Sequence, residues 1–554
     1  MPPPIARAAR LRADLDRLGD EVGAVGFGLQ SSRQESRRSH RDELVGVVRS
    51  YLIPRLGDPE APLLVVVAGP TGSGKSTVVN SLAEREVSRP GPLRPTTRQP
   101  VVWAHPDHSQ RYEQIGSVAA KVVTDTHPLL SDITIVDTPD IDSYVVDHRL
   151  VTQEILSHAD VVVFLTSAQR YADAVPWEVL SAIDRRGSVV LYVLNRLSRR
   201  SSGAVSDYSA LLRRRDLAFD EVYTIQEQRV RGEAAILPAR AVSKLAERLR
   251  LIARDRAGVL AAVTERATAY TVKAAGEVAS AVEDQEEERR RLEAVVEGSY
   301  ADAMAELTGE LERGTLIRTE VVERWSERVG TGEVARWVKG SASWLRDVAD
   351  RLTGQPAAVV DALEQEARRE LVDAVSTRLD RAARAVATAW DVDEIGSSLV
   401  TPDLRAASEE AREEVAVLVD EWLAGLTRMV EEEAPGRFRA ARVASTGVNA
   451  AAIGTILAVF AATGGLTGAE MGVAAGAAAA QQGILEHVLG RAAARSLSGS
   501  AQAGLLESLE RAFGIEADRF RHVLRAATDP VEMAGIIREA AAAVEMESER
   551  FHAG

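Results

Sequence analysis

The sequence contains no cysteine, and this absence excludes several kinds of chemistry at once. Without thiols there are no disulfides, no thiolate metal sites and no cysteine nucleophile. The absence of disulfides agrees with a reducing cytoplasm. Residues 1–20 are charged throughout and lack the apolar core of a secretory signal, so we expect the chain on the cytoplasmic side of the membrane.

The sequence also lacks an excess of positive charge. Its formal net charge is −15 and its pI is about 5.3. Because binding to nucleic acid is driven by clustered cations, we predict no nucleic-acid partner.

At 554 residues the chain is too long for one core, and about 150 residues per domain gives three or four units.

The most informative stretch is Gly69–Thr77, which reads GPTGSGKST and follows the apolar run Leu63–Ala68. It matches GxxxxGK[ST] between a strand-like run and a helix-compatible segment, which predicts a phosphate-binding loop. The glycines let backbone N–H groups converge on a phosphate, and the positive end of the following helix adds to the attraction. The predicted nucleotide contacts in this loop are Gly69, Thr71, Gly72, Ser73, Gly74, Lys75, Ser76 and Thr77. Lys75 would reach the β and γ phosphates, and the Ser76 hydroxyl would ligate Mg²⁺.

From residue 63 to about 250, short apolar runs alternate with helical segments, as a mostly parallel sheet covered on both faces requires. Ligands of such sheets collect at the carboxyl ends of the strands. The expected strands are Leu63–Ala68, Val101–Ala104, Ile133–Asp137, Val161–Thr166, Val189–Leu194 and Glu221–Ile225.

Helical patterns occupy the rest of the chain. Ile5–Leu29 and Glu35–Leu52 read as two helices before the loop. Beyond Gln226, apolar stripes predict a long helical bundle or stalk. One stripe is Leu245, Leu249, Ile252, Val259 and Val263, and another is Val360, Leu363, Ala367, Leu371, Val375 and Leu379.

The strand Ile133–Asp137 ends in a carboxylate that can hold Mg²⁺ as a second metal contact. Asp140 stands where GTPases normally have glycine. Its N–H can sense the γ phosphate, but its carboxylate is electrostatically unfavourable there unless it points away. Ile141 takes the position of the usual water-orienting glutamine, so that means of placing the attacking water is missing.

Two further segments lie where switch and base contacts are expected. In the polar stretch Arg94–Pro100, Thr97 is our choice for a hydroxyl that closes over Mg²⁺, with Thr96 next and a plain solvated turn as the alternative. Asn195 and Arg196 follow a strand where a guanine-specific protein shows Asn-Lys-x-Asp. Ser198 replaces the aspartate that reads guanine, so GTP is preferred on the whole pattern while ATP stays open.

A second distinctive stretch has almost no charge. Val443–Ala469 and Met471–Leu485 contain no charged residue, and Gly464 and Gly465 separate two limbs of a hairpin. A bilayer-spanning helix needs about 20 apolar residues, and each limb is barely adequate. Arginines flank the hairpin and would keep both ends on the cytoplasmic side. The alternative is a buried alanine-rich hairpin inside the helical bundle.

The order of these parts resembles that of dynamin-like GTPases, and more narrowly of actinobacterial ones linked to cell division and sporulation septation. The strings DTPDIDS (Asp137–Ser143), RYADAVPWEVL (Arg170–Leu180) and TGGLTGAE (Thr463–Glu470) carry the narrower resemblance. Dynamins have glutamine and serine where this chain has Thr71 and Gly72, so their charge-compensating cation cannot be transferred. The resemblance implies nucleotide-dependent pairing of GTPase domains and a hairpin that acts as a membrane anchor or paddle.

The expected fold is therefore an α/β P-loop GTPase domain plus a long all-α stalk with an apolar hairpin. The expected units are N-terminal helices (1–55), the GTPase domain (56–250), a helical stalk (251–442), the membrane-interacting hairpin (443–490) and returning C-terminal helices (491–554).

The expected function is slow GTP hydrolysis with Mg²⁺, coupled to membrane remodelling at the cytoplasmic face of the membrane or the division septum. Lys75 and Thr97 are the expected catalytic residues, and Ser76, Thr97 and Asp137 the metal ligands. Expected partners are membrane lipid through 443–490 and a homo-oligomer through the GTPase domain and stalk; a dynamin-like paralogue and cell-division proteins are further options. Two alternatives stay open: a nucleotide-gated scaffold with little hydrolysis, and a soluble P-loop ATPase.

Overall fold

The computed structural model describes residues 4–89, 99–142, 146–171, 174–198, 203–228, 230, 234–313, 357–433 and 491–553. The chain divides into two compact units. Unit 1 comprises Met1–Phe27, Arg33–Asp284 and Asp529–Gly554, and unit 2 comprises Gly28–Ser32 and Gln285–Thr528. Each unit has its own buried hydrophobic residues, in one cluster in unit 2 and in several clusters in unit 1.

The centre of unit 1 is a seven-stranded sheet with the order β5-β2-β6-β1-β7-β8-β9. Its neighbouring strands pair in parallel except β2 and β6, which are antiparallel. This confirms the predicted mostly parallel sheet. The strands are β1 (Leu63–Ala68), β2 (Val101–Ala104), β5 (Lys121–Thr124), β6 (Ile133–Asp137), β7 (Val161–Ser167), β8 (Val189–Leu197) and β9 (Val222–Gln226). A separate two-stranded sheet pairs β3 (Gln114–Ile115) with β4 (Val118–Ala119).

Both faces of the large sheet are buried, as the alternation along β1 shows. Leu63, Val65 and Val67 enter one hydrophobic cluster, whereas Leu64, Val66 and Ala68 enter another. The first cluster includes α4 (Lys75–Ala83) and α8 (Ala239–Arg254), and the second includes α5 (Val146–Ser157), α6 (Ala174–Arg185) and α7 (Ala204–Arg214). Burial on both faces explains why β1 is apolar at every position and β7 at its first five positions.

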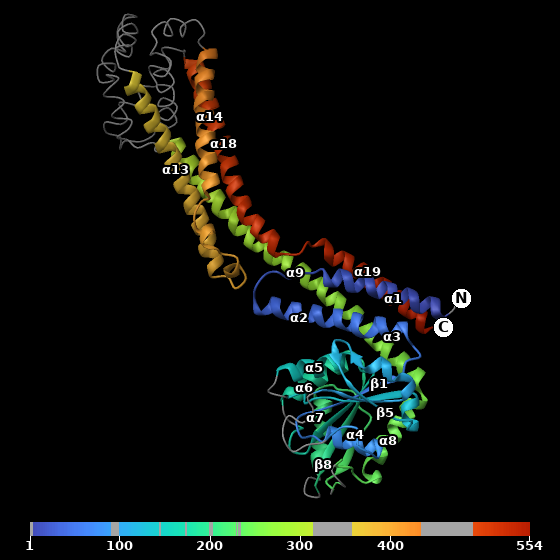
Figure 1. Cartoon of the computed structure of the whole chain (residues 1–554). Coiled ribbons are helices and arrows are strands. Elements are labelled where there is room, and N and C mark those ends of the chain that lie inside the picture. The colour runs from blue at the N-terminus through green and yellow to red at the C-terminus, as the bar shows by residue number, and fades with distance from the viewer. Residues whose placement is uncertain are drawn as a thin grey trace, which may run out of the picture. The chain divides into compact units, whose positions relative to one another are not determined.

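A second core in unit 1 is made mainly of helices, with Val25 and Phe27 from the loop after the first of them. It joins α1 (Pro4–Gly23), α2 (Ser32–Gly46), the π-helix η1 (Val47–Leu52), α3 (Ile53–Gly57), the first half of α9 (Arg256–Arg313) and α19 (Glu532–His552). The two ends of the chain meet here, because α1 packs along α19 (Figure 1). Asp529 fixes the same junction by accepting hydrogen bonds from the N–H groups of Gly26 and Phe27 at 2.7 and 2.8 Å.

Unit 2 is a helical bundle. Its core combines the second half of α9 with α13 (Ala357–Asp391), α14 (Glu409–Glu433) and α18 (Arg491–Ala527). Tyr300, Trp390, Phe513 and Phe520 meet in this core. Leu371, Val375 and Leu379 lie in it as well, which confirms the described part of the second apolar stripe.

Three expectations differ from the structure. The first helix ends at Gly23 rather than Leu29: Phe27 has a left-handed φ of 46°, which does not fit a continuing helix, and Val25 and Phe27 are buried in the loop that follows. The stripe beginning at Leu245 does not form one helical core: Leu245, Leu249 and Ile252 cover the sheet, Val263 belongs to the helical core, and Val259 packs against both. Finally, the second helical segment does not end at Leu52, because η1 continues directly into α3 and Pro54 lies in the first turn of α3, where proline is tolerated.

Candidate functional site

The phosphate loop connects β1 to α4 at the carboxyl edge of the sheet. Gly72 and Gly74 have φ angles of 76° and 98°, a backbone region that disfavours other residues. A Cβ on Gly74 would also lie 2.5 Å from Nδ2 of Asn195. Ser76 and Thr77 follow in the first turn of α4. The loop therefore has the backbone that the sequence pattern predicts for phosphate binding.

Lys75 lies beneath this loop with a side chain only 6% exposed. Its Nζ donates to the backbone oxygen of Gly69 at 3.0 Å and lies 2.5 Å from Oδ1 of Asp140. The carboxylate of Asp140 thus does not point away from the phosphate site. It holds the ammonium group that the sequence assigns to phosphate.

Asp137 ends β6 next to the loop and is completely buried. The hydroxyl of Ser76 donates to its Oδ2 at 2.5 Å, whereas its Oδ1 is buried without a hydrogen-bond partner among the described residues. Burial raises the pKa of Asp137, against the opposing effect of the Ser76 hydrogen bond. A carboxylate oxygen without a partner beside a hydroxyl is a donor set that suits Mg²⁺, which prefers oxygen ligands. The residues present therefore fit the expected ion.

Ser73 offers a further unsatisfied group on the loop. Its side chain is 1% exposed, and its hydroxyl has no partner within the described part of the chain. A buried hydroxyl without a partner is costly, so a phosphate oxygen that accepts from it would relieve that cost.

A polar clamp joins Thr71, Asp142 and Arg170. Oδ1 of Asp142 accepts from the N–H and the hydroxyl of Thr71 at 2.6 and 2.8 Å. Arg170, in the turn after β7, lies 2.6 Å from Oδ2 of Asp142 and donates to the backbone oxygen of Thr71 at 2.9 Å. Burial alone would raise the pKa of Asp142, but the Thr71 hydrogen bonds and the Arg170 charge lower it overall.

Asn195 supports the loop from behind. Its Nδ2 donates to the backbone oxygen of Ser73 at 2.7 Å, and its Oδ1 accepts from the N–H of Arg196 at 2.8 Å. Arg196 has an exposed side chain and a φ angle of 54°. Asn195 is thus a brace between β8 and the phosphate loop, and base recognition by Asn195 and Arg196 remains a prediction.

Ile141 is 3% exposed and packs in the core beneath α5 and α6. An apolar side chain in this position cannot hold a water molecule by hydrogen bonding. The burial of Ile141 therefore agrees with the expectation that this position does not orient the attacking water.

Two predicted parts of the site lie outside the described residues: Thr97 with its neighbour Thr96, and the apolar hairpin 443–490. Within the described part of the chain, no helix is both long and apolar enough to cross a bilayer.

Sequence reasoning missed the clamp. Asp142 and Arg170 belong to two of the strings that carry the family resemblance, but no local motif predicts a role for either residue. The usable signal was their placement just after β6 and β7, because β1 pairs in parallel with both of those strands. Charged residues at these ends meet at the phosphate loop.

Comparisons with known proteins agree with this geometry. Residues 64–196 match the model of the 50S ribosome-binding GTPase family. A probable chloroplastic transmembrane GTPase, FZO-like, from Arabidopsis thaliana is 28% identical over 173 residues, which is 28% of this chain and 19% of that protein. The chain thus spans about a fifth of the length of this curated relative.

Solved structures are similar at low identity. One chain of an oligomerised bacterial dynamin pair, described as sensing and tethering membranes, is 11% identical with a TM-score of 0.44 over 98% of this chain and 94% of its own. Era from Aquifex aeolicus bound to GDP.AlF4- is 19% identical with a TM-score of 0.24 over 34% of this chain and 56% of its own. The family match and the loop geometry together confirm a GTPase domain, and GTP with Mg²⁺ is the ligand pair that such a domain takes.

Proposed function

We propose that this dynamin-like GTPase binds GTP with Mg²⁺ at its phosphate loop and couples slow hydrolysis to membrane association. The observation that carries the proposal is the group of buried polar atoms at the loop. Lys75, Ser76 and Asp137 lie together there, and Oδ1 of Asp137 and the Ser73 hydroxyl have no partner among the described residues. Such atoms favour a site built for an anion and a cation together.

Within this site the loop residues have distinct roles. The N–H groups of the loop and of the first turn of α4 solvate phosphate oxygens, and Lys75 neutralises the charge that develops during phosphoryl transfer. Ser76 and Asp137 would hold Mg²⁺, with Thr97 as the proposed third ligand. When bound, Mg²⁺ supplies electrostatic stabilisation of the transferring phosphoryl group.

Slow turnover is the second element of the proposal. Ile141 is buried and cannot orient water, and Asp142 is engaged with Thr71 and Arg170. Hydrolysis then depends mainly on charge neutralisation, without a side chain that aligns the attacking water.

Membrane attachment is proposed through 443–490 as an anchor or paddle, at the cytoplasmic face and the division septum. Support comes from the scarcity of charge in this stretch of the sequence and from the relative named as a transmembrane GTPase. The same proposal places self-association in the GTPase domain (56–250) and stalk (251–442). The N-terminal helices (1–55) and the returning C-terminal helices (491–554) are proposed to pack on the helical bundle. A dynamin-like paralogue and septal proteins are further proposed partners.

The decisive experiment is liposome flotation of the intact chain and of a chain lacking 443–489, each with and without GTP. We expect flotation of the intact chain only, with lipid-stimulated GTP turnover. Equal flotation of both chains would contradict the hairpin's role.

Nucleotide binding is tested separately with Lys75→Ala, which should weaken GTP affinity. An unchanged affinity would contradict the assignment of the nucleotide site to this loop.

A nucleotide-gated scaffold is the second candidate, because the buried Ile141 favours binding without turnover. It predicts tight GTP binding, no lipid-stimulated hydrolysis and recruitment of another protein. A soluble ATPase is the third candidate, because Ser198 stands where a guanine-specific protein has the aspartate that reads guanine. This candidate predicts tighter binding of ATP than of GTP and no flotation.

A further inference from the structure

The segment after β6 carries two carboxylates separated by one apolar residue, Asp140-Ile141-Asp142. Both carboxylates contact the phosphate loop. Asp140 is 2.5 Å from Nζ of Lys75, and Asp142 accepts from Thr71 at 2.6 and 2.8 Å. The loop's ammonium group and one of its N–H groups are thus engaged by anions that belong to the chain itself.

The segment that carries Asp140 is held near the loop by the residues on either side of it. Ile141 is buried, and its N–H donates to the backbone oxygen of Gly69 at 3.4 Å. On the other side, Asp142 is held by Thr71 and Arg170. Asp140 itself is 20% exposed, so its contact with Lys75 is partly shielded from solvent. An ion pair placed in this way is less screened than one on the open surface.

Lys75 has three N–H donors. One donates to Gly69 and one faces Asp140, which leaves a single donor for a phosphate oxygen. A phosphate that approached this donor would also meet the negative charge of Asp140 at close range. Like charges at such distances disfavour each other strongly in a partly buried site.

We propose that Asp140 is an internal competitor of the nucleotide's phosphates: it occupies Lys75 in the nucleotide-free protein and must be displaced before GTP binds fully. The inference rests on the proposed nucleotide-binding function and adds a residue that sets its affinity. It gives the segment after β6 two states, one with Asp140 on Lys75 and one with phosphate there. Asp142 and Arg170 keep the segment close to the loop, so the carboxylate is at hand when phosphate leaves.

The test is equilibrium binding of GTP, GDP and GMP, with Mg²⁺, to the full chain and to Asp140→Asn. We expect GTP and GDP to bind on the order of tenfold more tightly to the variant, because the ion pair no longer competes. The affinity for GMP should change little, since a single phosphate at the nucleoside does not extend to Lys75. A merely structural effect of the substitution would alter all three nucleotides alike.

The matched control is Asp132→Asn. It removes the same charge directly before the first residue of β6, at the opposite end of that strand from the phosphate loop. It should leave all three affinities unchanged. Asp140→Ser serves as a second variant if Asp140→Asn does not fold, and thermal unfolding confirms that each variant is folded.

The outcomes separate the two claims. If the unmodified chain binds GTP while folded Asp140 variants bind it equally or more weakly, the competitor role is wrong and the nucleotide site stands. If no form of the chain binds a guanine nucleotide, the proposed function fails, and the inference fails with it.

Discussion

At the scale of single residues, Asn195 is a brace whose removal should loosen the phosphate loop. Its Nδ2 donates to Ser73 at 2.7 Å, and its side chain is 4% exposed. Asn195→Ala leaves the Ser73 oxygen without this donor, which costs about 1–3 kcal/mol. We expect a lower Tm of the nucleotide-free protein and weaker GTP binding, measured by thermal unfolding at several GTP concentrations. An unchanged Tm would show that Asn195 does not brace the loop.

Asp142 gives a prediction about pH. Its folded-state pKa is lowered, so the carboxylate stabilises the fold above the unfolded value near 3.9 and loses this effect as the pH falls through the lower folded pKa. The Tm difference between the unmodified chain and Asp142→Asn should therefore be constant down to about pH 5 and shrink below about pH 4. Thermal unfolding across this range measures it. A difference that grows on acidification has the opposite sign and would rule out an ionised clamp.

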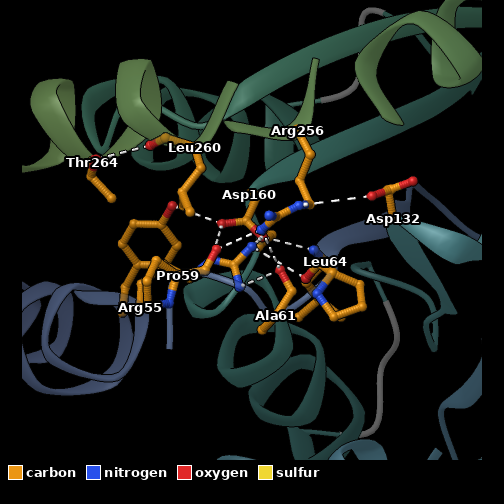
Figure 2. A network of polar contacts seen from close by, with 12 residues as sticks. Arg55, Pro59, Ala61, Leu64, Asp132, Asp160, Arg256, Leu260 and Thr264 are labelled. Atoms are coloured by element: carbon orange, nitrogen blue, oxygen red, sulfur yellow. Dashed lines mark hydrogen bonds and ion pairs between the residues drawn. The ribbon is translucent and has the colours of Figure 1, made fainter. Parts of the chain in front are cut away.

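At the scale of elements, Asp160 joins helix α3 to the sheet. Figure 2 shows the carboxylate of Asp160 beside Arg55 and Leu64. Its Oδ2 accepts from the guanidinium of Arg55 and from the N–H of Leu64, each at 2.7 Å. The hydroxyl of Tyr51, in η1, also donates to this carboxylate at 2.8 Å. Because these contacts lie at the amino end of β1 and the phosphate loop follows its carboxyl end, the junction is separate from the nucleotide site.

Asp160→Asn should consequently destabilise the protein without weakening GTP binding. The guanidinium of Arg55 would lose its charge partner at a site where it is only 11% exposed. Breaking such a pair costs about 3–5 kcal/mol. Asp220→Asn is the control, since Asp220 pairs with Arg248 but is 84% exposed, and it should cost about 0–1 kcal/mol. Thermal unfolding and GTP titration of both variants test the contrast; equal losses of stability would refute it.

The same elements show how far the sequence could be interpreted. Strands β1, β6, β7 and β8 were predictable because burial on both faces makes them continuous apolar runs. Strand β5 was missed because it lies at the sheet edge, and its residues Lys121–Thr124 are exposed or half-buried. The apolar spacing of Leu245 and Val263 correctly indicated helix, but spacing alone does not say which core a helix face contacts.

The site was predictable to a similar extent. The loop has a local sequence pattern, so Lys75 and Ser76 could be named, and Asp137 followed from its place at a strand end. The pairing of Thr71 with Asp142 and Arg170 could not be derived in this way. Thr71 is separated from Asp142 by 71 positions along the chain and from Arg170 by 99, and only the strand order brings these residues together.

At the scale of the whole molecule, the two units have separate cores that draw on distant parts of the chain. The helical core of unit 1 needs α19 from the end of the chain, whereas that of unit 2 combines α9, α13, α14 and α18. Helix α9 supplies residues to both. Separate cores predict that the units unfold in distinguishable steps, because two-state behaviour is a property of single domains.

A matched pair of core substitutions tests this division. Ile537 in α19 and Leu509 in α18 are both fully buried, the first in unit 1 and the second in unit 2. Replacing either by alanine should cost about 2–5 kcal/mol, through lost burial and the cavity left behind. In calorimetry we expect two transitions, with Ile537→Ala lowering one and Leu509→Ala the other. GTP should raise only the transition that Ile537→Ala lowers, because the phosphate loop belongs to unit 1. If both substitutions lowered a single shared transition, the two units would fold as one and the separation of their cores would have no thermodynamic meaning.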